Sequence, residues 1–350
     1  MYRIPNRRIF ALEMKKCKHY FTLLLFIICN QNAVSQEIGV NAITEVQTNF
    51  RGDVNFANQL RINFEVPLSS NISFEAQSLS VGITKEERIL NDLQNFSNLD
   101  AENLLFTLSK ACVKWEINDR NTVYAGIRNM NEDYFISDVT SFFVNASCGI
   151  FPTLSSNYNM ANYPFSSMGL HYTYQNNGFT YQASLYNGAG YNRFCGRDNL
   201  FRICPQSDGV FAITEASYKQ HNGSEYFIGA ATAPLNTRHT TYGLSVWAYT
   251  EQKLSKNLFL IADYGHDFAK DSFCQDFVGV GGKVDLNKVE IGLFTDYAHF
   301  TYRNEFATEI SAKISLGKYF YFQPAFHLIH INKTETSWHT ASLVRFGFDI

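Results

Sequence analysis

The residues best suited to bind another molecule lie in one stretch, Asn131-Glu-Asp-Tyr-Phe-Ile-Ser-Asp138, which follows the basic side chain of Arg128. Carboxylates beside aromatic rings suit a sugar, because rings cover its apolar face while polar groups bind its hydroxyls. The pattern predicts a carbohydrate-binding pore constriction made of Arg128, Glu132, Asp133, Tyr134 and Phe135. The alternative, which is favoured for any single ring, is that these aromatic residues only pack the loop against a wall.

Covalent and metal chemistry have no comparable support in the sequence. The histidines are scattered and form no Ser-His-Asp constellation with their surroundings. The chain contains no CxxC, no HExxH and no His pair at ligand spacing from the cysteines. The sequence therefore predicts a protein that is not an enzyme and that requires neither a cofactor nor a metal.

Composition narrows the class of protein that must carry this stretch. Of the 350 residues, 17% are charged and 15% are aromatic, whereas soluble domains usually have about 25% charged residues. The mean hydropathy of −0.18 excludes a bundle of membrane helices. The net charge of −3 excludes a strongly basic nucleic-acid-binding protein. Few charges and many rings favour an outer-membrane β-barrel.

The N-terminal segment is predicted to direct export of the protein. Lysines beside Met14 form a positively charged region, Phe21 to Cys29 form an apolar run, and Ala33-Val34-Ser35 form a cleavage site. Residues 1–36 are therefore predicted to be an N-terminal extension and a signal peptide, with either Met1 or Met14 as the start. The mature part then contains five cysteines, and Cys195 and Cys204 flank a loop-like stretch that a disulfide is predicted to close.

The rest of the chain, 37–350, repeats one pattern. In Phe56–Val66, apolar residues alternate with Gln59, Arg61, Asn63 and Glu65, and a period of two indicates a half-apolar strand. Similar segments predict sixteen strands, an even number that suits a closed antiparallel transmembrane barrel. Apart from one that begins at Ile72, they are expected at Ile38–Phe50, Phe56–Val66, Leu104–Ile117, Thr122–Met130, Ser167–Gln175, Phe179–Asn187, Val210–Gln220, Glu225–Ala233, Thr241–Thr250, Asn257–His266, Asp276–Asp285, Lys288–Ala298, Glu305–Leu316, Tyr319–Ile331 and Trp338–Ile350.

The connections alternate in length. Short turns such as Asn176-Asn177-Gly178 are predicted on the periplasmic side, where Asn and Gly accept positive φ. Long outer loops are predicted at Thr84–Glu102, at Gly188–Gly209 and at Asn131–Ser166, the third and longest. This asymmetry is typical of outer-membrane barrels. The polar faces of the strands, which carry acids and bases in near balance, are predicted to face a wet lumen as solvated wall residues.

Two runs resemble the OprB family of carbohydrate-selective porins. They are Tyr124-Ala-Gly-Ile-Arg-Asn-Met-Asn-Glu-Asp-Tyr-Phe135 and Thr140-Ser-Phe-Phe-Val-Asn-Ala-Ser147; Met168-Gly-Leu and Leu185-Tyr-Asn-Gly-Ala-Gly190 are also similar to that family's pattern. The resemblance implies a 16-stranded, sugar-permeable channel in the outer membrane. Its implied constriction residues carry over to Arg128, Glu132, Asp133, Tyr134 and Phe135. A homotrimer is common for such channels, and the sequence neither demands nor forbids it.

Other functions stay open at this point. An anion-selective porin would share the fold but should show a ladder of Lys or Arg along the lumen. A receptor or adhesin would act through the outer loops, whose targets the sequence does not reveal. The predicted partners are small sugars and outer-membrane lipid, with no nucleic acid.

Overall fold

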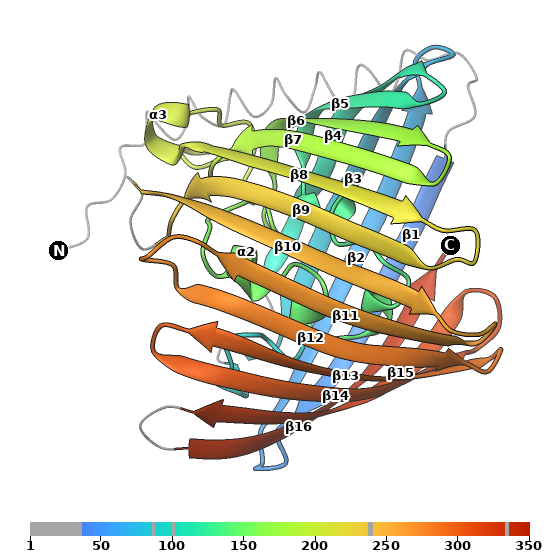
Figure 1. Ribbon diagram of the computed structural model, residues 1–350. Helices are drawn as coiled ribbons and strands as arrows, with labels where there is room; N and C mark the ends of the chain where they lie inside the picture. The colour runs from blue at the N-terminus through green and yellow to red at the C-terminus, as the bar shows by residue number, and fades with distance from the viewer. Residues whose placement is uncertain (1–36, 86–87, 100–101, 237–240, 333–335) are drawn as a thin grey trace.

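The computed structural model describes residues 37–350 except 86–87, 100–101, 237–240 and 333–335, so the predicted signal peptide lies outside the described residues. Sixteen antiparallel strands form a closed barrel in which β1 pairs with β16 (Figure 1). The strands are β1 Glu37–Thr48, β2 Val54–Pro67, β3 Ile72–Ile83, β4 Leu104–Asn118, β5 Asn121–Arg128, β6 Ser167–Asn176, β7 Phe179–Asn187, β8 Val210–Lys219, β9 Glu225–Pro234, β10 Tyr242–Lys253, β11 Leu258–Asp267, β12 Cys274–Asp285, β13 Val289–Phe300, β14 Arg303–Ser315, β15 Phe320–Asn332 and β16 Thr336–Asp349. The predicted fold class is confirmed.

The period-two pattern sets the two faces of the wall. In β2, Leu60 and Ile62 are exposed on the outside of the barrel. Arg61, which lies between them, points inward and reaches Glu132 of an inner loop. Because successive strand side chains point to opposite faces, one sequence register fixes the whole strand.

The two ends of the barrel differ as predicted. Turns of two to five residues join β2 to β3, β4 to β5 and each later pair at the same end, which we call the short-turn end. In the turn between β6 and β7, Asn177 and Gly178 have φ values of 48° and 80°, as a tight hairpin requires. Segments 84–103, 129–166 and 188–209 lie at the opposite, long-loop end. No helix among the described residues is long and apolar enough to cross a membrane.

The longest connection, residues 129–166 (the third loop), fills one side of the barrel interior. It contains three 3₁₀ turns, η1 Met130–Glu132, η2 Thr140–Phe142 and η3 Ala146–Cys148, and the short helix α2 Pro152–Ser155, which packs against β11 and β12. Its aromatic residues join inward-facing Phe211, Trp247 and Phe294 of the wall in one buried cluster. The expectation that the inner face is in contact with water is therefore wrong for β8–β13, because the third loop covers both the rings and the carboxylates of that sector.

Residues 84–103 (the second loop) also turn into the barrel. Phe96 and Leu90 pack on inward residues of β14–β16. Glu305 accepts hydrogen bonds from the backbone N–H of Leu93 at 2.9 Å. The two loops also bind each other, since Asn98 N–H donates to Val144 O at 2.7 Å. Together they cover much of the inner wall outside β1–β5.

Candidate functional site

The third loop is fixed where it leaves β5. Asn129 caps η1, because its Oδ1 accepts from the N–H of Asn131 at 2.9 Å and its Nδ2 donates to Phe165 O at 2.7 Å. Asn131 Oδ1 in turn accepts from the N–H of Tyr163 at 2.9 Å. The start and the end of the loop are thus tied together, and the direction of each side chain in η1 is defined.

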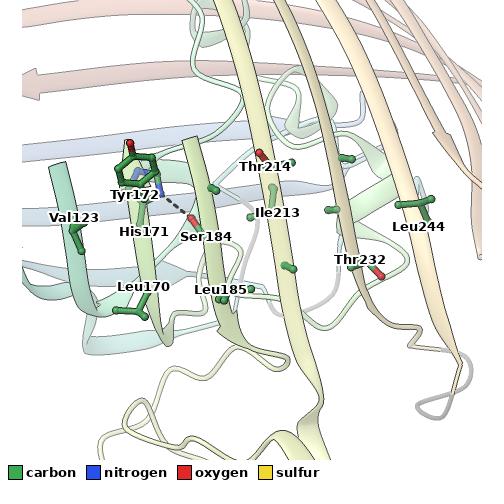
Figure 2. A pocket seen from close by; sticks show the side chains of 14 residues that line it. Val123, Leu170, His171, Tyr172, Ser184, Leu185, Ile213, Thr214, Thr232 and Leu244 are labelled. Atoms are coloured by element: carbon green, nitrogen blue, oxygen red, sulfur yellow. Dashed lines mark hydrogen bonds between the residues drawn. The ribbon is translucent and has the colours of Figure 1, made fainter. Parts of the chain in front are cut away.

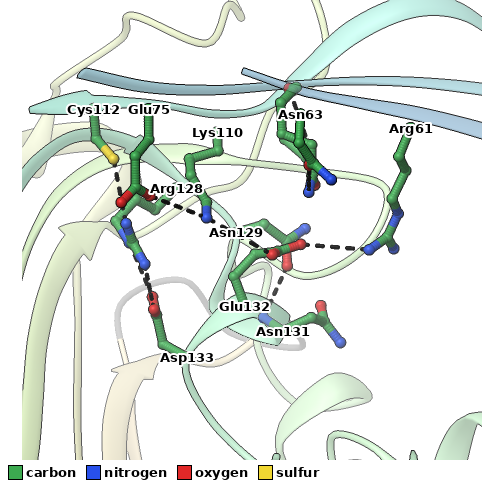
Figure 3. Close-up of polar contacts among 12 residues, drawn as sticks. Arg61, Asn63, Glu75, Lys110, Cys112, Arg128, Asn129, Asn131, Glu132 and Asp133 are labelled. Carbon is green, nitrogen blue, oxygen red and sulfur yellow. Dashed lines mark hydrogen bonds and ion pairs between the residues drawn. The ribbon is translucent and has the colours of Figure 1, made fainter. Parts of the chain in front are cut away.

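Glu132 is the one predicted site residue that faces the charged wall of β2–β4. Its Oε1 lies 3.4 Å from Arg61 Nη1, and its Oε2 lies 4.0 Å from Lys110 Nζ. Lys110 also lies 3.3 Å from Glu75 Oε2. All four side chains are between 15% and 29% exposed. We call Arg61, Glu75, Lys110 and Glu132 the charged eyelet (Figure 3).

One ring lies beside this eyelet. The Arg61 guanidinium carbon is 5.9 Å from the centre of the Tyr163 ring. Tyr163 packs partly against inward-facing Leu79 and Val81 as well. The eyelet therefore combines two cations, two anions and an aromatic face, which can hydrogen-bond and stack on a polar solute.

Asp133 points away from Glu132, its neighbour in sequence, and is buried (Figure 3). Its Oδ2 accepts from Arg128 Nε at 3.0 Å, and its Oδ1 pairs with Arg128 Nη2. Tyr186 OH donates to the same carboxylate at 3.3 Å. The Arg128 guanidinium stacks 4.2 Å from the centre of the Tyr124 ring and is itself only 3% exposed. This pair anchors the loop instead of lining the lumen, which corrects the prediction for both residues.

The predicted role of Tyr134 and Phe135 is also wrong. Tyr134 is 1% exposed, and its hydroxyl shares a 2.7 Å hydrogen bond with Ser184 Oγ. Phe135 lies with its ring centre 4.9 Å from Trp247 and 4.9 Å from Phe151. Both residues pack the loop onto the wall, so the packing alternative describes them.

Buried carboxylates on the wall hold the rest of the loop. Glu309 accepts from the backbone N–H of Val144 at 3.0 Å and of Asn145 at 2.9 Å. Glu251 accepts from the N–H of Val139 at 2.6 Å. Since a buried N–H without a partner is costly, these wall residues fix the loop by satisfying its backbone. The expectation that such charges are solvated does not hold for this sector.

The second loop contains its own buried acid. Asp92 Oδ2 accepts from the N–H of Phe96 at 2.7 Å. Burial, together with the nearby negative charge of Glu305, raises the pKa of Asp92 from 3.8 to about 7. The packing of this loop is therefore sensitive to protonation near neutral pH.

Two hollows differ in what they can accept. A cavity of about 330 Å³ at the short-turn end is lined by Asn63, Glu65, Gln77 and by Glu75 and Lys110 of the eyelet. A hollow of about 570 Å³ over β5–β10 is lined by small and apolar residues such as Ala183, Leu185 and Leu244, with no Asp, Glu, Lys or Arg (Figure 2). The first continues from the eyelet, whereas the second offers no charged group to a polar solute.

The predicted Cys195–Cys204 disulfide is absent. Cys204 is a free cysteine, and the bonds that Ser207 makes to it lower the pKa of its thiol. The chain turns at this point into the helix α3, Pro205–Asp208, which directs Cys204 toward Ser207. Among the described residues, no group of three His, Cys, Asp or Glu side chains is arranged to hold a metal ion.

Comparison with known proteins identifies the architecture. A scan of the sequence against protein-family models gives no match, and a search of curated proteins finds no significant relative. Among solved structures, OprB of Pseudomonas putida at high pH superposes with a TM-score of 0.77 at 14% identity, covering 90% of this chain and 94% of that one. The fold is that of a porin.

Two further porin-type barrels agree with this assignment. A mutant of the Rh. blastica porin gives a TM-score of 0.62 at 12% identity and covers 90% of this chain and all of that one. OmpT of Vibrio cholerae with loop L8 deleted gives 0.58 at 10% identity over 90% and 99% of the two chains. At these identities the likeness concerns the porin fold alone.

Arg61, Glu75 and Lys110 belong to the polar strand faces that the sequence assigns to the lumen, but no pattern in the sequence gives these three residues a role. Their meeting depends on register, because Gln77 pairs with Lys110 immediately before an irregularity between β3 and β4. Tyr163 was missed, although it precedes Pro164 within the loop that was expected to matter. No local pattern marks a residue that returns to the eyelet from the far end of a long loop.

Proposed function

We propose that this porin-fold protein is an outer-membrane channel for the passive diffusion of small polar solutes, with carbohydrates as its preferred class. The charged eyelet is the observation that supports this proposal. Its two cations and two anions lie within 4.0 Å of one another in pairs. A balanced site of this kind attracts neither sign of ion strongly, while its donors, acceptors and the Tyr163 ring suit a neutral sugar.

Transport would need no covalent step. A solute enters a weak site where hydrogen bonds replace part of its hydration, and it leaves because those bonds are few. Arg61 and Lys110 would donate to sugar hydroxyls, and Glu75 and Glu132 would accept from them. The 330 Å³ cavity beyond the eyelet has room for a monosaccharide-sized solute on the same path.

Planar-bilayer conductance of the refolded mature protein tests the proposal. We expect glucose, maltose or a related sugar to block the current saturably. Block by phosphate alone would instead favour an anion channel. A demonstrably folded barrel without conductance would contradict channel function and direct attention to the outer loops.

Glu132→Gln tests the role of the eyelet itself. The substitution leaves Arg61 and Lys110 without the loop's carboxylate, at distances of 3.4 and 4.0 Å. A unit charge at about 4 Å contributes about 1 kcal/mol even in water. We therefore expect the anion-to-cation permeability ratio, measured from reversal potentials, to rise about fivefold.

The matched control for this test is Asp138→Asn. Asp138 is an exposed carboxylate in the same loop, so the substitution removes the same charge outside the eyelet. The control should leave the permeability ratio within about twofold of the wild-type value. An equal shift in both variants would mean that the effect is one of net charge, and the eyelet would lose its assigned role.

A further inference from the structure

Residues 188–209 (the fourth loop) lie against the outside of the barrel, not over its mouth. Leu200 of this loop is buried together with Leu108 and Ile127, and Phe194 and Phe201 pack beside them. Ile127 pairs with Ala111 on one side and with Met168 on the other, in a row that faces away from the lumen. Ile127 is only 1% exposed although it stands on the outer face. The loop therefore covers the wall of β4–β6.

The strands beneath explain why the barrel needs this cover. β5, β6 and β7 have 8, 10 and 9 residues, whereas β4 has 15. A tilted strand needs about 9–11 residues to cross a bilayer. Ile127 is the last residue but one of β5. Of these three strands, β5 alone is shorter than this range, and the fourth loop extends the apolar wall at the long-loop end of β5.

Beside it, apolar side chains are exposed in a way that water disfavours. Leu105 is 95% exposed, and the neighbouring Phe106 stacks on Phe194 with ring centres 6.1 Å apart. Ile203 of the loop is 66% exposed. These side chains continue the apolar band of the barrel, so acyl chains are the natural environment for them.

The fourth loop contains charged side chains that form ion pairs and others that form none with the described residues. Both of its acidic side chains face Arg202, with Asp208 at 2.8 Å and Asp198 at 4.0 Å. Arg193 and Arg197 are exposed, and neither forms an ion pair with another residue in the described part of the chain. The surface thus presents two unneutralised guanidinium groups next to exposed apolar side chains.

We propose that the fourth loop binds a phosphorylated lipid of the outer leaflet, with Arg193 and Arg197 on the phosphates and Leu105, Phe106 and Ile203 against the acyl chains. The proposal rests on the outer-membrane location given under "Proposed function" but not on the solute that passes. Charge complementarity favours this lipid, because planar guanidinium groups pair with phosphate oxygens. Because Leu105, Phe106 and Ile203 continue the lipid-facing band, the phosphates of a lipid bound there would lie level with Arg193 and Arg197.

The test measures binding of phosphorylated lipid A, and of the same lipid after dephosphorylation, to the purified full channel in non-ionic detergent. The variant is Arg193→Ala/Arg197→Ala. Its matched control is Arg51→Ala/Lys270→Ala, which removes the same charge from exposed turns elsewhere at the long-loop end. We expect the double variant to bind phosphorylated lipid A about 30-fold more weakly, as expected for two basic residues at an anionic lipid surface. The control should change the affinity less than threefold.

Three outcomes of the binding measurement would overturn the proposal. They are equal affinity of wild type and double variant, equal loss in the control, and equal binding of both lipids by the wild type. Binding of a second copy of the chain to this face would also overturn the proposal. Light scattering would then detect an oligomer that the variant Leu105→Ser/Ile203→Ser converts to monomers, while this variant still binds lipid. Conductance separates the two proposals, because the double variant should keep wild-type sugar block. If sugars do not block the wild-type channel, the proposed solute class is contradicted and the lipid proposal is unaffected.

Discussion

Arg128→Ala separates an anchor of the third loop from a residue of the pore. Arg128 is the last residue of β5, and Asp133, its partner, belongs to the loop. Without the guanidinium, the partners of the buried carboxylate among the described residues are Tyr186 OH at 3.3 Å and His171 Nε2 at 3.7 Å. Removing one partner of a buried ion pair costs about 3–5 kcal/mol. That cost destabilises the packed position of the loop, so the state in which the loop is released from the wall should become about 150- to 4,000-fold more populated.

The fluorescence of Trp247 reports whether the third loop has left its packed position. It is buried against Phe135, whereas Trp115 and Trp338 are exposed on the outer face. In a Trp115→Phe/Trp338→Phe background, emission comes from Trp247 alone. We expect Arg128→Ala to shift that emission to the red in mild denaturant and to accelerate amide exchange over residues 129–165.

Two further variants test whether the effect of Arg128→Ala comes from the unpaired charge of Asp133. Arg128→Met/Asp133→Leu removes both charges, and such apolar replacements are often neutral or stabilising, so most of the loop's protection should return. Lys114→Ala removes a cation from the inner face of β4 that pairs with Glu116 at 2.7 Å and not with the loop. It should leave Trp247 emission unchanged. Wild-type emission and exchange in Arg128→Ala, together with an altered ion selectivity, would refute the anchoring role and return Arg128 to the pore.

Two further predictions concern the loops. Phe135→Ala should cost about 3–5 kcal/mol in guanidinium unfolding, because it opens a cavity among Phe151, Trp247 and Tyr249, while the reversal potential stays at the wild-type value; a changed potential with unchanged stability would place the ring in the pore. The raised pKa of Asp92, about 7, means that the stability it confers is fully present below pH about 4 and is lost as pH rises through about 7. Amide exchange near Phe96, corrected for intrinsic rates, should therefore accelerate between pH about 4 and 7. An equal acceleration in Asp92→Asn would rule out this carboxyl as the cause.

The strands were predictable because their pattern is local. In β2 the pleat alone sends Arg61 and Asn63 to one face and Leu60 and Ile62 to the other. β10 shows where this reasoning weakens. Its inward residues include Trp247 and Tyr249, and its outward residues include Leu244 and Val246, so both faces are apolar. Only the loop that covers the inner face explains the pattern, and that contact is far away in sequence.

The site was less predictable for a similar reason. Glu132 and Asp133 are adjacent carboxylates with the same local chemistry, yet one faces the eyelet and the other is buried on Arg128. The difference arises from the turn of η1, which Asn129 and the returning chain at Tyr163 hold in place. Backbone hydrogen bonds between residues more than thirty positions apart leave no periodic trace in a sequence.

If the protein is the channel proposed above, the burial of its charged side chains limits which of them can select a solute. Carboxylates such as Glu309 and Glu251 are already committed to loop N–H groups and are buried. Substituting these carboxylates would displace a loop, and this structural effect would outweigh any change in the electrostatic field of the lumen. The partly exposed charges of the eyelet are different, because their bonds of 3.3–4.0 Å are long and a solute can compete for them. Selectivity at the level of the loops should therefore respond to β2–β4 and Glu132, while variants across β8–β14 should act through stability.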